Sequence, residues 1–235
     1  GMVFRSFKNV KRGIGSIRQD VNVSIKYGAR IEIKGWQDLP TLPKLIRNEV
    51  QRQLSLLDIK QLLQQRGLRE IKNDIVDVTA DFSQTQFKVI FELLQKKGKV
   101  FALRLPHFSG LLKKEICEGK TFGKELAEYA IAYGTKGMIH SDEDIEKYQL
   151  ADEFQRLKKR LQAQEQDLIL IVAEQEDTAK AAITAVLQRA RYCLQGIPEE
   201  TRVPHHSNAT TSYARPLPGE HRMYPESDLP LIAID

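Results

Sequence analysis

Hydrophobic and polar positions alternate near the start of the chain in the way that paired β-strands require. Within residues 17–25 the apolar Val21, Val23 and Ile25 fall on one face of an extended strand. Ile31 and Ile33 repeat the pattern after a turn, where Gly28 can supply a positive φ. The segment therefore predicts a hairpin, and its polar face would gather Asp20, Asn22, Glu32 and Lys34.

The spacing changes to that of a helix after residue 40. Thr41 is a suitable N-cap, Pro43 is tolerated in the first turn, and Gly67 offers a stop. We expect this helix to pack an apolar stripe under the hairpin. The stripe would consist of Leu42, Leu45, Ile46, Val50, Leu54 and Leu57.

The middle of the chain alternates strand and helix patterns. Strands are predicted at 76–82, 99–105, 137–140 and 168–172, and helices at 84–97, 121–133, 150–163 and 177–194. The alternation predicts a self-contained α/β layer of about four strands covered by helices, over residues 68–197. From Pro198 onward, recurring prolines exclude a long helix and indicate loop and edge-strand structure.

Composition is that of ordinary globular material, with 41% hydrophobic and 29% charged residues. No apolar run approaches the roughly 20 residues that span a bilayer, and no signal peptide is visible, so we expect a cytoplasmic protein without membrane contact. We interpret Gly1 before Met2 as a residue left by expression. Cys117 and Cys193 lack the spacing of a zinc site or a disulfide framework, and we expect them to be structural.

Positive charge is concentrated at the start of the chain. The net charge is +5, and residues 1–60 hold twelve Lys and Arg against five Asp and Glu. Such asymmetry indicates a polyanionic partner near this segment. A solvated basic surface is the alternative.

Two groups of residues could carry chemistry. Asp20 and Glu32 are hard oxygen ligands of the kind that Mg²⁺ takes, and Arg18 and Lys34 could hold phosphate or carboxylate groups. An ordinary solvated strand face is the competing interpretation. The proline-fixed segment 215–230 offers a second anion site through Arg215, Arg222 and Glu226, or else it is a loop pinned by surface salt bridges.

Other chemistries find no support in the residue spacing. His205 and His206 are adjacent, and adjacent side chains point apart in an extended chain, so they do not suggest a metal pair. The sequence contains no GxGxxG, P-loop, GxSxG or HExxH pattern.

Several long runs of sequence resemble a known family. Residues 11–25, 28–35, 37–39 and 215–230 resemble signatures of the GatB/GatE amidotransferases. Residues 98–106 and 132–137 resemble the GAD domain, which bacterial-type aspartyl-tRNA synthetases share with GatE, the archaeal branch of that family. The GatB branch lacks this insertion, so the resemblance is closer to the archaeal branch.

The resemblance implies an α+β fold with three parts. Residues 68–197 would be a GAD-like, partly ferredoxin-like domain. It would be inserted into a glutamine-synthetase-like cradle, the catalytic domain of the family. Residues 2–67 would supply a hairpin and a long helix to that cradle, and residues 198–235 would be its return segment.

The resemblance also implies a ligase that converts Glu-tRNA(Gln) to Gln-tRNA(Gln) in translation. ATP and Mg²⁺ would serve to phosphorylate the glutamyl carboxylate. Ammonia would come from an asparaginase-like amidohydrolase, the D subunit, in a heterodimer or heterotetramer. Asp20 and Glu32 match catalytic or metal positions. The residues implied near the substrate, the tRNA(Gln) acceptor end or phosphate are Arg18, Asn22, Lys34, Arg215, Arg222 and Glu226.

The sequence departs from the family pattern at both ends. The family's further metal-binding His and Glu residues and its tRNA-engaging tail do not occur in this sequence, so we expect a piece of a longer protein that is inactive alone. Two alternatives remain open: a piece of a bacterial-type aspartyl-tRNA synthetase, and a non-catalytic tRNA-binding module.

Overall fold

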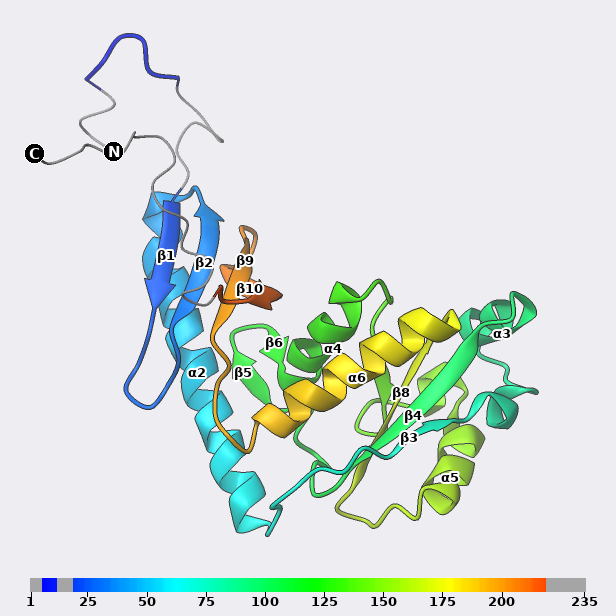
Figure 1. The fold of residues 1–235 in the computed structure, drawn as a ribbon. Helices are drawn as coiled ribbons and strands as arrows, with labels where there is room; N and C mark the ends of the chain where they lie inside the picture. The colour runs from blue at the N-terminus through cyan, green and yellow to red at the C-terminus, as the bar shows by residue number, and fades with distance from the viewer. Residues whose placement is uncertain (1–5, 12–18, 219–235) are drawn as a thin grey trace, which may run out of the picture.

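A four-stranded sheet joins the two ends of the described chain. The computed structural model describes residues 6–11 and 19–218. Strands β1 (Gln19–Val23) and β2 (Ile31–Trp36) form the predicted antiparallel hairpin, with Asn22 opposite Glu32. Strand β9 (Glu200–His205) pairs parallel with β2, and β10 (Thr210–Pro216) pairs antiparallel with β9 (Figure 1). The sheet order is therefore β1-β2-β9-β10.

The hairpin turn differs from the prediction at one position. Tyr27, rather than Gly28, takes the positive φ, at 65°. A Cβ atom on Gly28 would lie 2.2 Å from Gln53 Oε1 and 2.5 Å from Ile25 Cγ1. Glycine is required here because the turn approaches the following helix closely, and Gln53 Oε1 accepts a hydrogen bond from Ala29 N at 3.1 Å.

Helix α2 (Leu42–Gln65) follows a short 3-10 turn (Leu39–Thr41) and ends before Gly67, whose φ is 81°. Its predicted apolar stripe is wrong in part, because Ile46 and Leu54 are 37% and 46% exposed. The buried face instead carries Leu45, Asn48, Glu49, Arg52, Gln53, Ser55, Leu56, Ile59 and Leu63. Five of these nine buried side chains are polar or charged, and they must find hydrogen-bond or ion-pair partners.

The middle of the chain forms a second, wholly antiparallel sheet with the order β3-β4-β8-β7. Buried strands β4 (Lys99–Leu105) and β8 (Leu168–Glu174) lie at its centre, between β3 (Ile75–Asp77) and β7 (Ile139–His140). The strand predicted at 76–82 stops at Asp77, because the chain turns into a 3-10 helix (Thr79–Phe82). Asp77 Oδ1 accepts a hydrogen bond from Thr79 N at 2.9 Å in that turn.

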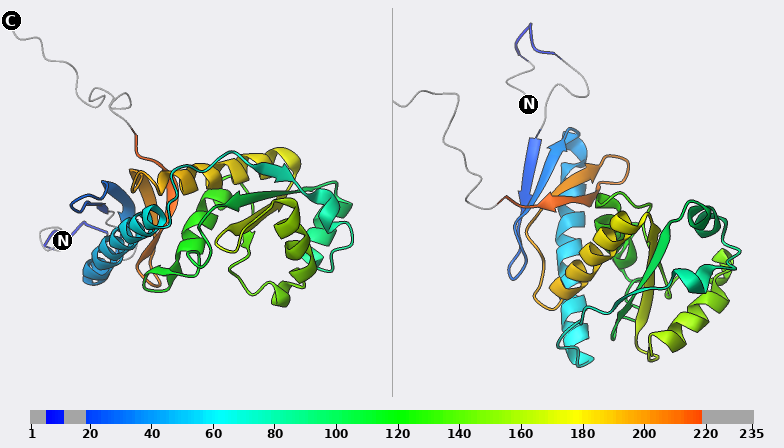
Figure 2. Two further views of the ribbon diagram at one scale, coloured as in Figure 1. Left: turned by 90° about the horizontal axis from the view of Figure 1, so that it is seen from below. Right: turned by 45° about the vertical axis from the view of Figure 1, so that its right-hand side comes forward.

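Helices cover both faces of this second sheet (Figure 2). On one face α4 (Phe122–Ala132) and α6 (Glu176–Tyr192) share a core with the alternate β4 residues Phe101, Leu103 and Leu105. On the other face α5 (Ala151–Arg160) and α3 (Lys88–Gln95) share a core with Val100 and Ala102. A third 3-10 turn (Glu146–Tyr148) precedes α5, and the short hairpin β5 (Glu115–Cys117) and β6 (Lys120–Thr121) was not predicted. The fold is α+β, as expected.

The two sheets belong to one continuous structure. Ile31 and Ile33 of the first sheet lie in the same buried cluster as residues of α4, α6, β4 and β8. Helix α2 lies against β5, and β10 lies against α4 (Figure 1). Among the described residues, no helix has both the length and the apolar character needed to cross a membrane.

Candidate functional site

Polar side chains from all four strands of the first sheet meet on one of its faces. Asn22 pairs with Glu32, Glu32 with Thr201, and Thr201 with Arg215, so these four residues form one row across β1, β2, β9 and β10. Paired residues of neighbouring strands point to the same face. The sheet therefore brings Arg215 onto the face that carries the predicted hairpin residues, although nearly two hundred positions separate them in sequence.

Two carboxylates on this face share one ammonium. Lys34 Nζ donates to Asp20 Oδ2 at 2.9 Å and to Glu32 Oε1 at 2.7 Å. The second Asp20 oxygen accepts from Gly35 N at 3.0 Å, and the second Glu32 oxygen accepts from Thr201 Oγ1 at 3.1 Å. The hydrogen bond to Glu32, with that to Asp20, raises the pKa of Lys34 above its ordinary value. The three charged side chains are 20–39% exposed, so they remain accessible to a ligand.

The structure brings together five of the predicted site residues: Asp20, Asn22, Glu32, Lys34 and Arg215. Arg18, Arg222 and Glu226 lie outside the described residues. Of the two adjacent histidines, His206 stacks on Trp36 with ring centroids 4.7 Å apart.

The carboxylate pair has the donor chemistry that Mg²⁺ requires, but it is not a complete cage. Mg²⁺ is usually held by one or two carboxylates together with water and phosphate oxygens. Asp20, Glu32 and Lys34 together carry a net charge of −1, and the ammonium of Lys34 lies between the two carboxylates. Within residues 6–11 and 19–218, no three His, Cys, Asp or Glu side chains are grouped to hold a metal ion. Two carboxylate ligands fit, provided that Lys34 turns away and other oxygens complete the shell.

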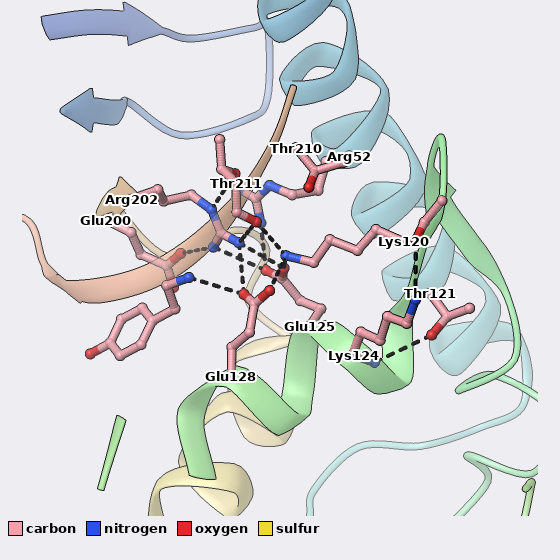
Figure 3. A network of polar contacts seen from close by, with 12 residues as sticks. Arg52, Lys120, Thr121, Lys124, Glu125, Glu128, Glu200, Arg202, Thr210 and Thr211 are labelled. Carbon is pink, nitrogen blue, oxygen red and sulfur yellow. Dashed lines mark hydrogen bonds and ion pairs between the residues drawn. The ribbon is translucent and has the colours of Figure 1, made fainter. Parts of the chain in front are cut away.

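The opposite side of β9 holds a buried charge network that sequence analysis did not predict (Figure 3). Its centre is Glu125 of α4, which is fully buried. The carboxylate of Glu125 contacts Arg52 Nη1 at 2.6 Å, Lys120 Nζ at 2.6 Å and Arg202 Nη2 at 2.9 Å. These three cations come from α2, β6 and β9, so one carboxylate ties together three separate elements.

Arg202 links this network to the first sheet from within β9. It is fully buried, and its Nη1 donates to Glu200 Oε2 at 2.6 Å while its Nη2 donates to Glu128 Oε2 at 3.0 Å. Its Nε donates to Thr211 Oγ1 at 2.8 Å, within the same sheet. The network as a whole contains four basic and four acidic side chains. It consists of Arg52, Lys120, Arg189 and Arg202 with Glu49, Glu125, Glu128 and Glu200.

The environment sets the charge states of the buried acids in opposite directions. Burial opposes ionisation of Glu125, but Arg202, Lys120 and Arg52 outweigh it and hold the pKa of Glu125 well below its usual value. Burial dominates at Glu200 and raises its pKa to about 7, even though Arg202 opposes that rise. The two carboxylates therefore differ in the pH range in which they hold a proton.

A signal for the network does exist in the sequence. Glu49, Arg52 and Gln53 follow the i, i+3, i+4 spacing of one helix face, and this face continues the buried apolar positions Leu45 and Leu56. A charged group embedded in an apolar stripe indicates a buried ion pair, but it does not identify partners more than seventy residues away.

Known proteins share sequence similarity with this chain over nearly its whole length. The family model for the GAD domain matches residues 90–183, which lie inside the predicted 68–197. Three archaeal relatives, each named as the E subunit of glutamyl-tRNA(Gln) amidotransferase, match over nearly the whole chain. The protein of Pyrococcus furiosus is 47% identical over 100% of this chain, that of Thermococcus sibiricus 48% over 99%, and that of Methanocaldococcus jannaschii 46% over 100%.

The match is complete for this chain but partial for its relatives. The chain spans about 37% of the length of each of these proteins. The similarity includes both flanks of the GAD match, where the hairpin and the β9–β10 pair lie. The resemblance expected from the sequence is confirmed: the chain contains a GAD domain and is similar, from end to end, to one section of GatE, the archaeal E subunit of glutamyl-tRNA(Gln) amidotransferase.

Proposed function

We propose that this chain is a section of a tRNA-dependent amidotransferase, and that the polar face of its first sheet forms part of the site that amidates Glu-tRNA(Gln). The observation that carries the proposal is the row formed by Asn22, Glu32, Thr201 and Arg215, with Asp20 and Lys34 beside it. Acids and bases from the chain's distant ends meet there in a half-exposed arrangement, within the cradle domain that the resemblance implies.

The acidic and the basic residues of this face have different proposed roles. Asp20 and Glu32 would supply two carboxylate ligands to Mg²⁺, and Lys34 and Arg215 would neutralise phosphate or carboxylate oxygens of the substrates. Bound ATP with Mg²⁺ supplies the phosphoryl group that activates the glutamyl carboxylate for attack by ammonia. Lys34 can serve both states, because its ammonium holds the two acids when no cation is present and can turn to an anion when one binds.

The proposed partners follow from the same resemblance. The nucleic-acid partner would be tRNA(Gln), and the basic excess of residues 1–60 supports a contact with its phosphates. An asparaginase-like amidohydrolase, the D subunit of the enzyme, would supply the ammonia. The similarity over both flanks favours this assignment over an aspartyl-tRNA synthetase, which would share only the GAD domain.

Substitution in the full-length protein, assembled with its amidohydrolase partner, tests the proposal. Glu32→Gln and Asp20→Asn should each lower the amidation rate by about 100-fold or more, because each removes an anionic ligand of the Mg²⁺ that would neutralise the transferred phosphoryl group. Glu176→Gln is the matched control, since this acid is exposed and pairs with Lys180 on α6. Rates for Glu32→Gln and Asp20→Asn within about threefold of the control would overturn the proposal.

The chain alone should be inactive, because a complete metal site needs further ligands. Steady turnover of Glu-tRNA(Gln) by this chain with ATP and ammonium would contradict that expectation.

A non-catalytic tRNA-binding role has one specific observation in its favour, the basic excess near the N-terminus. Contacts to the phosphate backbone of tRNA release counterions. The logarithm of the tRNA affinity should therefore fall with the logarithm of the salt concentration, with a slope that corresponds to several ions. Lys8→Glu with Lys11→Glu should reduce that slope by about two. A flat salt response would remove the nucleic-acid role from this segment.

A further inference from the structure

Strand β9 carries contacts of opposite kinds on its two faces. Thr201 points to the polar face, is 3% exposed and donates its hydroxyl to Glu32 Oε2 at 3.1 Å. Its neighbours Glu200 and Arg202 point to the other face and join the buried charge network. One three-residue stretch therefore connects the carboxylate of the candidate site to the interior of the molecule.

The carboxylate of Glu32 is held by two donors that differ in freedom. Lys34 holds Oε1 from a long side chain that is 29% exposed, and it can swing away. Thr201 holds Oε2 from a short, buried side chain on a paired strand. When Lys34 leaves, Thr201 is the donor that still fixes the orientation of the carboxylate.

The position of β9 is itself fixed by α4, which lies inside the GAD match. Glu125 and Glu128 of α4 bind Arg202 at 2.9 Å and 3.0 Å. Glu128 Oε2 also accepts from the backbone N of Tyr213 in β10 at 3.0 Å. Helix α4 thus binds the β9–β10 pair at two points, the side chain of Arg202 and the backbone N of Tyr213.

We infer that Thr201 is a positioning residue for Glu32. The GAD domain fixes the position of Thr201, because Glu128 of α4 binds Arg202 in β9 and the backbone N of Tyr213 in β10. This inference rests on the proposed function, in which Glu32 is a cation ligand. It assigns the GAD domain a role at the site, which is to hold strand β9 so that Thr201 orients the carboxylate of Glu32.

The test measures Mn²⁺ binding, as a probe for Mg²⁺, to the full-length protein in complex with its amidohydrolase partner. Thr201→Val keeps the shape of the side chain and removes the donor, and it should raise the Mn²⁺ dissociation constant by about 10-fold or more, as the loss of a residue that orients a metal ligand does. Thr201→Ser keeps the donor and should restore binding to within about threefold of the wild type. Thr184→Val is the matched control, because its hydroxyl donates only to Lys180 O within α6.

A second variant tests the link to the GAD domain. Glu128→Gln should weaken Mn²⁺ binding in the wild-type background and add little in the Thr201→Val background, since coupled residues are not additive. Thermal melts of each variant confirm that it is folded at the temperature of the assay. Equal effects of Glu128→Gln in both backgrounds would overturn the route through Thr201.

The outcomes separate this inference from the proposed function. Unchanged Mn²⁺ affinity in Thr201→Val, together with weakened affinity in Glu32→Gln, would overturn the positioning role and leave the proposed site standing. Unchanged affinity in Glu32→Gln would overturn the metal role of Glu32, and the positioning role would fall with it.

Discussion

Neutralising Glu125 should cost a large part of the stability of this chain. The side chain introduced by Glu125→Gln has nearly the same size as the original. It is uncharged, however, and it leaves Arg52, Lys120 and Arg202 without their shared carboxylate at a fully buried position. Its amide NH₂ would also have to face one of these cations. Removing one partner of a buried ion pair typically costs about 3–5 kcal/mol. We therefore expect Glu125→Gln to lower the free energy of unfolding by about 3–5 kcal/mol. This is a large part of the whole, because the free energy of unfolding of a domain is about 5–15 kcal/mol.

Urea denaturation at pH 7 measures this loss. Trp36 is the sole tryptophan and is fully buried, so its fluorescence reports the first sheet, while far-UV circular dichroism reports the whole fold. The exposed Glu176→Gln, whose partner is one helical turn away, should change stability by less than about 0.5 kcal/mol. A loss below about 1 kcal/mol in Glu125→Gln would refute the reasoning.

The pH dependence has a definite sign. The pKa of Glu125 is held well below its usual value, so its contribution is present above the ordinary carboxyl pKa and is lost as pH falls through the lowered value. The difference between wild type and Glu125→Gln should therefore shrink under strong acid. A difference that grows on acidification would contradict the assignment of a charged Glu125.

Three further predictions concern other buried groups. Gly28→Ala should lower stability by about 2 kcal/mol, because its Cβ would displace Gln53 Oε1 from a buried hydrogen bond, and an unchanged urea midpoint would contradict this. Burial raises the pKa of Glu200 to about 7, so its stabilising contribution is full below the ordinary carboxyl pKa and disappears as pH rises through 7. Wild type should therefore lose stability relative to Glu200→Gln between pH 5 and 8, whereas a constant difference would exclude the raised pKa. Cys117 and Cys193 are buried thiols, and burial raises the pKa of both, that of Cys117 to about 11. A thiol reagent at pH 8 should label them only in urea, and rapid labelling of the folded chain would contradict their burial.

Sequence periodicity was sufficient for the parts of the fold that are governed by local patterns. The alternation at Val21, Val23, Ile31 and Ile33 predicted the hairpin, and the apolar run at 168–172 predicted the central strand β8. The polar face could be predicted for the same reason, since alternation assigns each residue of a strand to a side. The strand at 76–82 was too long because the local hydrogen bond from Thr79 to Asp77 competes with strand geometry.

Long-range pairing could not be predicted from these patterns. No periodicity shows that Thr201 lies beside Glu32 or that Arg215 follows in the same row, because register between distant strands depends on the whole fold. The apolar stripe of α2 failed for a related reason. Arg52 and Gln53 count as polar in any pattern, yet they are buried because Glu125 and the hairpin turn supply their partners.

The parallel pairing of β2 with β9 constrains the order in which the chain can fold. During synthesis β2 emerges before its neighbour β9, which follows only about 170 residues later. The entropy cost of closing so long a loop falls when the intervening segment has already collapsed into a compact body whose ends lie close together. The folded segment between β2 and β9 would then assist the pairing of these two strands by bringing them together. Until it is complete, β2 presents an unpaired edge to other nascent chains, and this edge is where aggregation of truncated products should begin.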